Sequence, residues 1–224
     1  KRQSWRGGGG DCRQHRMSRL VKICGLKDAA GFDAAIAAGA DFVGFVFFAP
    51  SPRYVTSVEA QELSLRHAGG PQRVGLFVNP SLDEVDDVLK DISLDILQVH
   101  GTKAQVQALR LRFGRPVWHA LGVEREAEFP AHDDTADGYI VEAKPPAGAT
   151  RPGGNAVQAD WDLLAKFRPA KPWLLAGGLT PANVARGLAQ TGAPGADVSS
   201  GVERAPGEKD PALIRAFIEA VKRG

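Results

Sequence analysis

The sequence predicts a closed (β/α)8 barrel, and three observations favour this fold. Short apolar runs rich in Val, Ile, Leu and Phe recur eight times along the 224 residues. Segments with a helical period lie between them, and this alternation indicates a parallel sheet, because each parallel crossover needs a connection long enough for a helix. Eight such units fit a closed barrel better than the alternative, an open doubly wound sheet, because no G-x-G-x-x-G motif follows the first strand.

The eight predicted strands are runs of β-branched, aliphatic and aromatic residues, which favour extended structure. In the first strand, alternation places Lys22 and Cys24 on one face and Val21 and Ile23 on the other. The apolar pair is expected to meet the helices, so Lys22 points into the barrel, where it can pair with Asp197 on the neighbouring eighth strand. The runs cover residues 20–24, 42–47, 73–78, 95–99, 116–120, 138–142, 172–176 and 195–199.

Seven segments between and after these strands have the period of a helix. Ser81 before the acidic residues Asp83 and Glu84, and Thr180 before Pro181, are signals for the start of a helix. The segment 122–134, after the fifth strand, has the weakest helical pattern. The seven segments cover residues 28–39, 57–68, 81–91, 103–113, 159–167, 180–190 and 210–223.

The positive charge of the chain is concentrated at its N-terminus. The formal net charge is +2, and residues 1–16 are polar, Gly-rich and basic. They contain no apolar stretch of the length that a secretory signal needs. We therefore expect residues 1–17 to be a disordered tail or an expression-derived extension, and residues 18–224 to form one catalytic barrel domain.

Composition excludes several classes of protein. A near-neutral body is unlike a nucleic-acid binder, which needs concentrated Lys and Arg. No apolar run approaches the ~20 residues that span a bilayer, so no membrane partner is expected. Cys12 and Cys24 make no disulfide framework, which favours a cytoplasmic location. No His/Cys cluster has metal-ligand spacing, so we expect no metal site, and no Ser-His-Asp arrangement is evident.

Glycine-bearing loops follow the seventh and eighth predicted strands. In barrels of this type the active site lies at the carboxyl ends of the strands, and these two loops hold phosphate, because glycines let backbone N–H groups approach the anion. The alternative is that paired glycines only permit tight strand-to-helix turns. The candidates for phosphate binding are Gly177, Gly178, Ser200 and Gly201.

Cys24 and Glu142 end the first and sixth predicted strands and share the inward-facing side of the barrel mouth. A thiolate base and a carboxylic acid across a pocket suit proton transfer at two positions of one substrate, as an isomerase requires. The alternative for Cys24 is a buried structural cysteine. The alternative for Glu142 is a surface carboxylate paired with Lys144 or Arg151.

Seven motifs make the sequence similar to a known family. From Arg19 to Gly224, the motifs resemble phosphoribosylanthranilate isomerase of tryptophan biosynthesis in order and spacing: "VKICGLKD", "FVGFVFFAPSPRYV", "VGLFVN", "LQVHG", "KPPAGATRPGGNAVQADWDLL", "LLAGGLTPANV" and "DVSSGVERAPGEKD". The resemblance implies a cofactor-independent barrel enzyme that converts N-(5′-phosphoribosyl)anthranilate to 1-(2-carboxyphenylamino)-1-deoxyribulose 5-phosphate by an Amadori rearrangement. It also implies a small phosphoribosyl substrate and a monomer or homodimer.

The resemblance implies roles for individual residues. Cys24 matches the general base that takes the C2′ proton, and Arg53 matches the arginine that engages the anthranilate carboxylate. Asp197 matches an aspartate expected near the sugar hydroxyls, and His100 matches a histidine expected at the pocket wall. The glycine-bearing loops match the phosphate site of the family.

Glu142 departs from the family pattern. The family has an aspartate there, the general acid that protonates the ribose ring oxygen. One extra methylene moves the carboxyl by roughly 1.5 Å, and a misplacement of ~1 Å can cost on the order of 100-fold in rate. The leading hypothesis is a working isomerase whose pocket has adjusted. The alternatives are a weakened or inactive barrel that binds phosphorylated sugars, and an isomerase for a related phosphoribosyl substrate, the aminoimidazole ribotide of histidine synthesis.

Three other features of the sequence have predicted roles. Gly153 and Gly154, after the sixth strand, predict a mobile lid loop that excludes water from the site, with an ordinary long connection as the alternative. His119, at the end of the fifth strand, is either a packed rim histidine or a substrate contact. Trp161, just after a helix start, is predicted to pack rather than to take part in chemistry.

Overall fold

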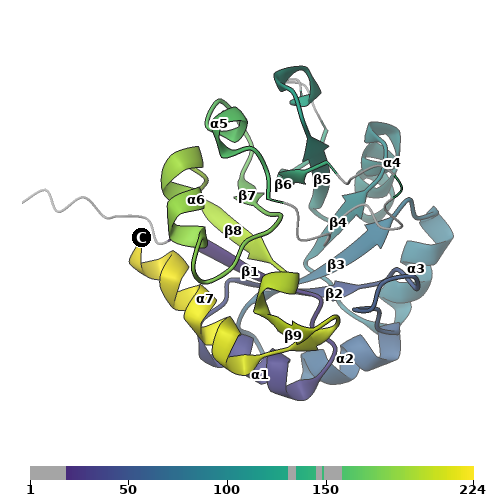
Figure 1. Cartoon of the computed structure of the whole chain (residues 1–224). Coiled ribbons are helices and arrows are strands. Elements are labelled where there is room, and N and C mark those ends of the chain that lie inside the picture. The colour runs from purple at the N-terminus through teal and green to yellow at the C-terminus, as the bar shows by residue number, and fades with distance from the viewer. Residues whose placement is uncertain (1–18, 131–134, 145–147, 149–157) are drawn as a thin grey trace, which may run out of the picture.

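The strands of this protein close into one barrel surrounded by helices. The computed structural model describes residues 19–130, 135–144, 148 and 158–224. Eight parallel strands follow one another around the barrel in chain order, and β1 pairs with β8 to close it (Figure 1). The predicted (β/α)8 barrel is therefore confirmed, and the open sheet is excluded.

Each strand overlaps its predicted range. The fifth strand runs three residues beyond the range expected for it, and the seventh is shorter than expected. The bounds are β1 Leu20–Cys24, β2 Phe42–Val46, β3 Gln72–Val78, β4 Ile96–His100, β5 Val117–Val123, β6 Gly138–Ala143, β7 Trp173–Leu175 and β8 Gly195–Val198.

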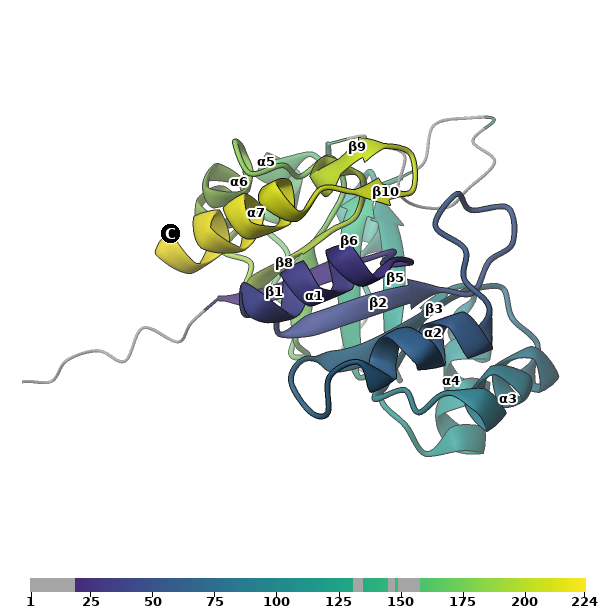
Figure 2. The ribbon, with the colours of Figure 1, turned by 90° about the horizontal axis from the view of Figure 1, so that it is seen from below.

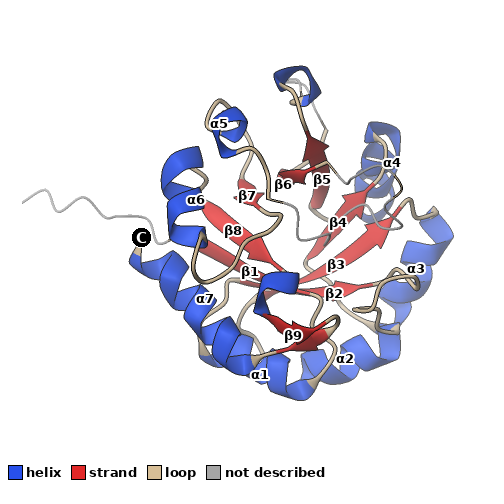
Figure 3. Cartoon of the chain, viewed as in Figure 1, coloured by secondary structure: helices blue, strands red, loops and turns tan. Residues whose placement is uncertain are grey.

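The helices pack around the outside of the strands (Figure 3). Capping boxes at Thr56, Ser81 and Thr102 begin three of them, because each side chain accepts a hydrogen bond from the third residue of its helix. Within the described residues, no helix has the length and apolar character needed to cross a membrane. The bounds are α1 Ala29–Ala37, α2 Ser57–Leu65, α3 Leu82–Asp91, α4 Lys103–Phe113, α5 Trp161–Leu164, α6 Val184–Thr191 and α7 Pro211–Arg223.

The helix predictions were least accurate on one side of the barrel. Between β5 and β6, the described residues contain only a 3-10 turn, η1 Glu126–Glu128, where the weak pattern had left a helix in doubt. Helix α6 begins at Val184 instead of Thr180. The Asn183 side chain accepts a hydrogen bond from the Thr180 N–H and donates one to the Gly178 carbonyl, and these bonds hold a turn ahead of the helix.

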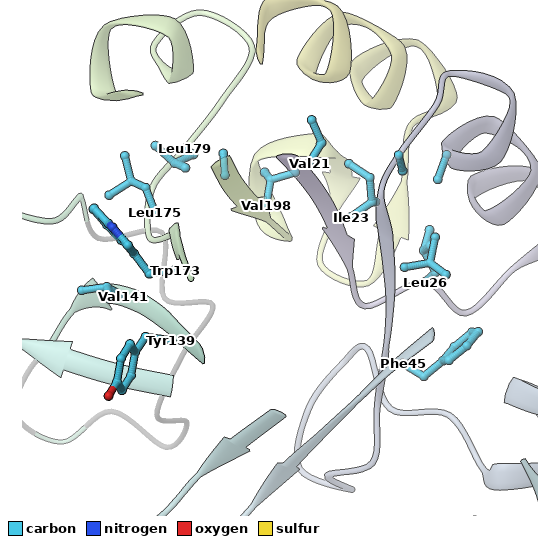
Figure 4. Packing of buried hydrophobic residues seen from close by; sticks show 14 of the residues in the cluster. Val21, Ile23, Leu26, Phe45, Tyr139, Val141, Trp173, Leu175, Leu179 and Val198 are labelled. Carbon is cyan, nitrogen blue, oxygen red and sulfur yellow. The ribbon is translucent and has the colours of Figure 1, made fainter. Parts of the chain in front are cut away.

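Apolar side chains form two separate layers, as the strand alternation predicts. Val21 and Ile23 of β1 lie in the outer layer, between the strands and the helices, with Leu175 of β7 (Figure 4). The inner layer fills the barrel with a smaller set of side chains: Phe42, Val74, Ile96, Trp118, Ala120, Ile140, Leu174 and Ala176. The barrel is therefore a packed core rather than a pore.

The predicted pair of Lys22 and Asp197 lies inside this barrel. Lys22 Nζ is 2.9 Å from Asp197 Oδ1, and the lysine side chain is fully buried. Burial lowers the pKa of Lys22, but Asp197 and Cys24 outweigh burial, so the pKa is raised. Lys22 therefore stays charged beneath the mouth of the barrel.

A short hairpin covers part of the carboxyl-end face. After β8 come the 3-10 turn η2 Ser200–Val202 and two antiparallel strands, β9 Glu203–Ala205 and β10 Glu208–Lys209. Figure 2 shows β9 and β10 beyond the end of β8, just before the chain enters α7. This face is the one where a barrel of this type places its active site.

Candidate active site

One cleft at the carboxyl ends of the strands collects the predicted site residues. It encloses about 740 Å³ of empty space, partly open to solvent. All nine predicted residues that the structure describes line it: Cys24, Arg53, His100, Glu142, Gly177, Gly178, Asp197, Ser200 and Gly201. The predicted lid residues Gly153 and Gly154 lie outside the described residues.

Cys24 ends β1 with its side chain in the cleft and only 3% exposed. A Cβ on Gly44 would lie 3.1 Å from Cys24 Sγ and 3.2 Å from Lys22 Nζ, so the glycine leaves the space that both groups occupy. Burial raises the pKa of the Cys24 thiol above its usual value, although the positive charges of Lys22 and Lys209 act in the opposite direction. Once deprotonated, such a thiol is a stronger base than an exposed one.

Glu142 reaches the same cleft from β6, with 8% of its surface exposed. It shares the inward face of β6 with Ile140, which belongs to the core inside the barrel. Lys144 is the residue that the surface alternative paired with Glu142, and its Nζ lies 3.4 Å from carboxylate oxygens of both Glu124 and Glu128. The cleft thus has a thiol from β1 and a carboxyl group from β6, as the strand alternation predicted.

Arg53 lies in the loop after β2, and its side chain is 7% exposed. Gly25, which follows Cys24, has φ +74°, and a Cβ there would lie 2.7 Å from Arg53 Cδ, so the arginine lies directly over this glycine. The Arg53 guanidinium donates from Nε and Nη2 to the two carboxylate oxygens of Glu203, each at 2.8 Å. The arginine predicted to bind a substrate carboxylate therefore also holds a carboxylate of the protein.

His100 ends β4 and is partly exposed in the cleft. Burial lowers its pKa to about 4, and the positive charges of Lys22 and His119 act in the same direction. The imidazole is therefore neutral near pH 7. It can accept or donate a hydrogen bond at the cleft wall without adding charge.

Replacing His100 by asparagine is expected to make folding less sensitive to acid. An unfolded histidine titrates near pH ~6.5, and the folded one near 4, so the unfolded chain binds more protons between these values. Wild-type stability should fall as the pH falls through this window, by up to about 3 kcal/mol, and less where cleft water solvates the ring. Urea unfolding at pH 7 and pH 4.5 measures the difference. Parallel losses in wild type and variant would contradict the expectation.

The two glycine-bearing loops lie against each other at the rim. Gly177 and Gly178 have φ of +82° and +63°, a conformation that other residues adopt with strain. A Cβ on Gly201 would lie 1.8 Å from the carbonyl oxygen of Leu179, so the loop after β8 packs directly on the loop after β7. The turns require these glycines, as the conformational alternative proposed, and residues of both loops line the cleft.

Three further residues of this region, Gln98, Glu203 and Lys209, have no role predicted from the sequence. Gln98 of β4 is 1% exposed and lines the cleft, and its Oε1 has no hydrogen-bond partner. Alternation on β4 from His100 could have identified it. Glu203 and Lys209 lie within residues 197–210, and only the structure shows that their side chains are buried and that Glu203 pairs with both Arg53 and Lys209.

Two other predictions concerned packing. His119 is 5% exposed, and its Nε2 is 2.9 Å from the Gly101 carbonyl oxygen. It is not among the residues that line the cleft, which favours the packed alternative. Trp161 is 4% exposed within the outer core, as predicted.

Among the described residues, no group of three or more His, Cys, Asp or Glu side chains could hold a metal ion.

Comparison with known proteins finds one family throughout the described barrel. The family model of N-(5′-phosphoribosyl)anthranilate (PRA) isomerase matches residues 21–220. An N-(5′-phosphoribosyl)anthranilate isomerase of Granulibacter bethesdensis is 49% identical, over 92% of this chain and 99% of the relative. The similarity therefore extends over nearly the whole of both chains.

Solved structures agree with the sequence comparison. A phosphoribosyl anthranilate isomerase in complex with reduced 1-(o-carboxyphenylamino)-1-deoxyribulose 5-phosphate has a TM-score of 0.76 and 29% identity, over 92% of this chain and all of the other. Monomers made from the dimeric phosphoribosylanthranilate isomerase of Thermotoga maritima have a TM-score of 0.73 and 30% identity, with the same coverage.

Proposed function

Because this chain belongs to the N-(5′-phosphoribosyl)anthranilate isomerase family, we propose that Cys24 and Glu142 are the base and acid of that reaction. The protein is an aldose–ketose isomerase of tryptophan biosynthesis. It converts N-(5′-phosphoribosyl)anthranilate to 1-(2-carboxyphenylamino)-1-deoxyribulose 5-phosphate. The observation that carries the proposal is that both side chains line one cleft, from β1 and β6, together with both glycine-bearing loops.

The proposed mechanism assigns one proton transfer to each residue. Glu142 donates a proton to the ribose ring oxygen, and the C1′–O bond breaks to leave an open chain with an iminium at C1′. The positive iminium makes the C2′ hydrogen acidic, and the Cys24 thiolate removes it to give an enolamine. Tautomerisation of the enolamine yields the ketone at C2′. The substrate gains and loses no atoms overall, so the reaction needs no oxidant or reductant.

The two anionic ends of the substrate bind different groups of the cleft. The anthranilate carboxylate binds Arg53, because a guanidinium can donate two parallel hydrogen bonds to a carboxylate. The phosphate binds backbone N–H groups of the loops after β7 and β8, which contain Gly177, Gly178, Ser200 and Gly201. His100 contacts the substrate from the cleft wall, and Asp197 accepts from a sugar hydroxyl.

Two wider features belong to the same proposal. A catalytic thiol has to stay reduced, which supports a cytoplasmic location. The relative from Thermotoga maritima is described as dimeric, and this chain is proposed to act as a monomer or a homodimer.

A fluorescence assay tests the function directly. N-(5′-phosphoribosyl)anthranilate is generated in situ, the protein is added, and the decay of substrate fluorescence is followed. We expect decay that depends on enzyme concentration and is lost in the double variant Cys24→Ala/Glu142→Gln. No decay with wild type would exclude the assignment and favour a barrel that only binds phosphorylated sugars, or an isomerase for a related phosphoribosyl substrate.

A further inference from the structure

The carboxylate of Glu203 connects two parts of the cleft that are far apart in sequence. Its Oε1 accepts from Arg53 Nε at 2.8 Å and from Lys209 Nζ at 2.7 Å. Its Oε2 accepts from Arg53 Nη2 at 2.8 Å and from the Gly207 N–H at 3.2 Å. The glutamate side chain is only 4% exposed.

These four hydrogen bonds make Glu203 unsuitable as a general acid or base. A carboxylate accepts about four hydrogen bonds, and Glu203 has that number within the protein. Burial raises its pKa, but the hydrogen bonds and charges of Arg53 and Lys209 outweigh burial and hold the pKa below its usual value. Glu203 therefore remains an anion whose oxygens are already occupied.

The geometry of Arg53 leaves one edge of its guanidinium for another ligand. A guanidinium has five N–H groups. Glu203 occupies the edge formed by Nε and Nη2. The second edge, formed by Nη1 and Nη2, can bind a second carboxylate in a parallel, two-bond arrangement. Because Arg53 lines the cleft, Glu203 can orient this second edge without competing for it.

Lys209 extends the connection to the loop after β8. Its Nζ donates to the Ser199 carbonyl oxygen at 2.8 Å and lies 3.3 Å from Ser199 Oγ, immediately before the Ser200–Gly201 segment. The lysine is 3% exposed and packs on α1, where a Cβ on Gly31 would lie 2.9 Å from Lys209 Cβ. Its only charged hydrogen-bond partner among the described residues is Glu203.

The hairpin that carries Glu203 and Lys209 packs tightly on the loop that carries Arg53. A Cβ on Gly207 would lie 2.3 Å from the Pro52 carbonyl oxygen, and Gly207 has φ +82°. No larger residue could replace this glycine without separating the hairpin from the Pro52–Arg53 segment. The contact fixes the hairpin against the segment that carries Arg53.

We propose that Glu203 is a positioning residue that orients Arg53 and, through Lys209, the loop after β8, and so sets the spacing between the carboxylate-binding and phosphate-binding ends of the cleft. The inference rests on the proposed roles of Arg53 and of the glycine-bearing loops. It implies that the cleft prefers substrates in which an aromatic carboxylate and a phosphate are separated by one particular distance.

The test uses the full chain and two small competitive probes, anthranilate for the carboxylate end and inorganic phosphate for the phosphate end. Glu203→Gln keeps the shape of the side chain but removes its charge and one acceptor oxygen. We expect both inhibition constants to rise about tenfold or more, as loss of charge-assisted hydrogen bonds predicts, and KM to rise with them. Arg53→Ala should weaken the binding of anthranilate but not that of phosphate.

A double-mutant cycle separates this inference from the proposed function. Adding Glu203→Gln to Arg53→Ala should cause little further loss of anthranilate binding, because Glu203 acts on that end through Arg53. The inference would be overturned if the two substitutions had fully additive effects on anthranilate binding. It would also be overturned if Glu203→Gln left the inhibition constants of both probes unchanged. If Arg53→Ala leaves anthranilate inhibition unchanged, the role of Arg53 in the proposed function fails instead.

Two controls distinguish positioning from stability. Glu208→Gln changes an exposed glutamate of the same hairpin that pairs with Arg204, and it should leave both constants unchanged. A merely structural role would lower the amount of folded enzyme, and thus apparent kcat, without changing KM.

If Glu203→Gln does not fold, Glu203→Asp serves as a second variant. The aspartate keeps the negative charge for Lys209, but its side chain is shorter, so the variant should still bind anthranilate more weakly than wild type. Unchanged anthranilate binding in Glu203→Asp would overturn the inference.

Discussion

Cys24→Ala is expected to lower kcat by about 10²- to 10⁴-fold, the usual contribution of a general base. KM should change little, because the proposed binding groups, Arg53 and the glycine-bearing loops, remain. The loss in volume is small, although the side chain is buried, so the variant should fold. Single-turnover and steady-state rates in the fluorescence assay measure the effect.

The control for this prediction is Cys12→Ala, which removes the other cysteine of the chain. It should leave kcat unchanged. Binding of a product analogue to Cys24→Ala, measured by calorimetry, checks that the cleft is intact. A Cys24→Ala enzyme that turns over at the wild-type rate would rule out Cys24 as the base, and Cys24 would then be the structural cysteine that its burial alone favours.

Glu142→Gln is expected to lower kcat by a similar factor, about 10²- to 10⁴-fold, because the amide cannot donate a carboxylic proton to the ring oxygen. Glutamine has nearly the same shape, so substrate affinity should be retained. Rates and KM from the same assay test this. Wild-type turnover in Glu142→Gln would mean that another group opens the ring.

Glu142→Asp tests whether the length of the side chain is matched to the cleft. Shortening by one methylene withdraws the carboxyl by roughly 1.5 Å, and we expect a loss on the order of 100-fold if the cleft is built around glutamate. A large gain in rate from a very slow wild type would instead show that the natural acid is misplaced. That outcome would support the weakened barrel as the correct description of this protein.

The sequence predicted most of the fold because its signals are local. The alternation in β1 correctly separated Lys22 from Val21 and Ile23, and a parallel sheet in chain order made β1 and β8 neighbours. The errors were at element boundaries, as at Thr180. There, hydrogen bonds between Asn183 and the loop after β7 hold a turn that no periodic pattern reveals.

The candidate site was predicted for the same reason. Strand ends converge at one face of a barrel, so knowledge of where each strand ends was enough to bring Cys24, Glu142 and the glycine-bearing loops together. Gln98 was missed although it occupies an inward position on β4 beside the predicted His100.

The sequence by itself determined which residues form strands, in what order the strands lie, and which side chains face the barrel interior, because backbone periodicity and turn chemistry depend on near neighbours. Only the tertiary structure decided that Arg53 pairs with Glu203, 150 positions away, and that burial raises the pKa of Cys24. Both depend on which elements surround a side chain. A charge and its solvation are set by neighbours in space, and those neighbours come from strands and loops that are distant in sequence.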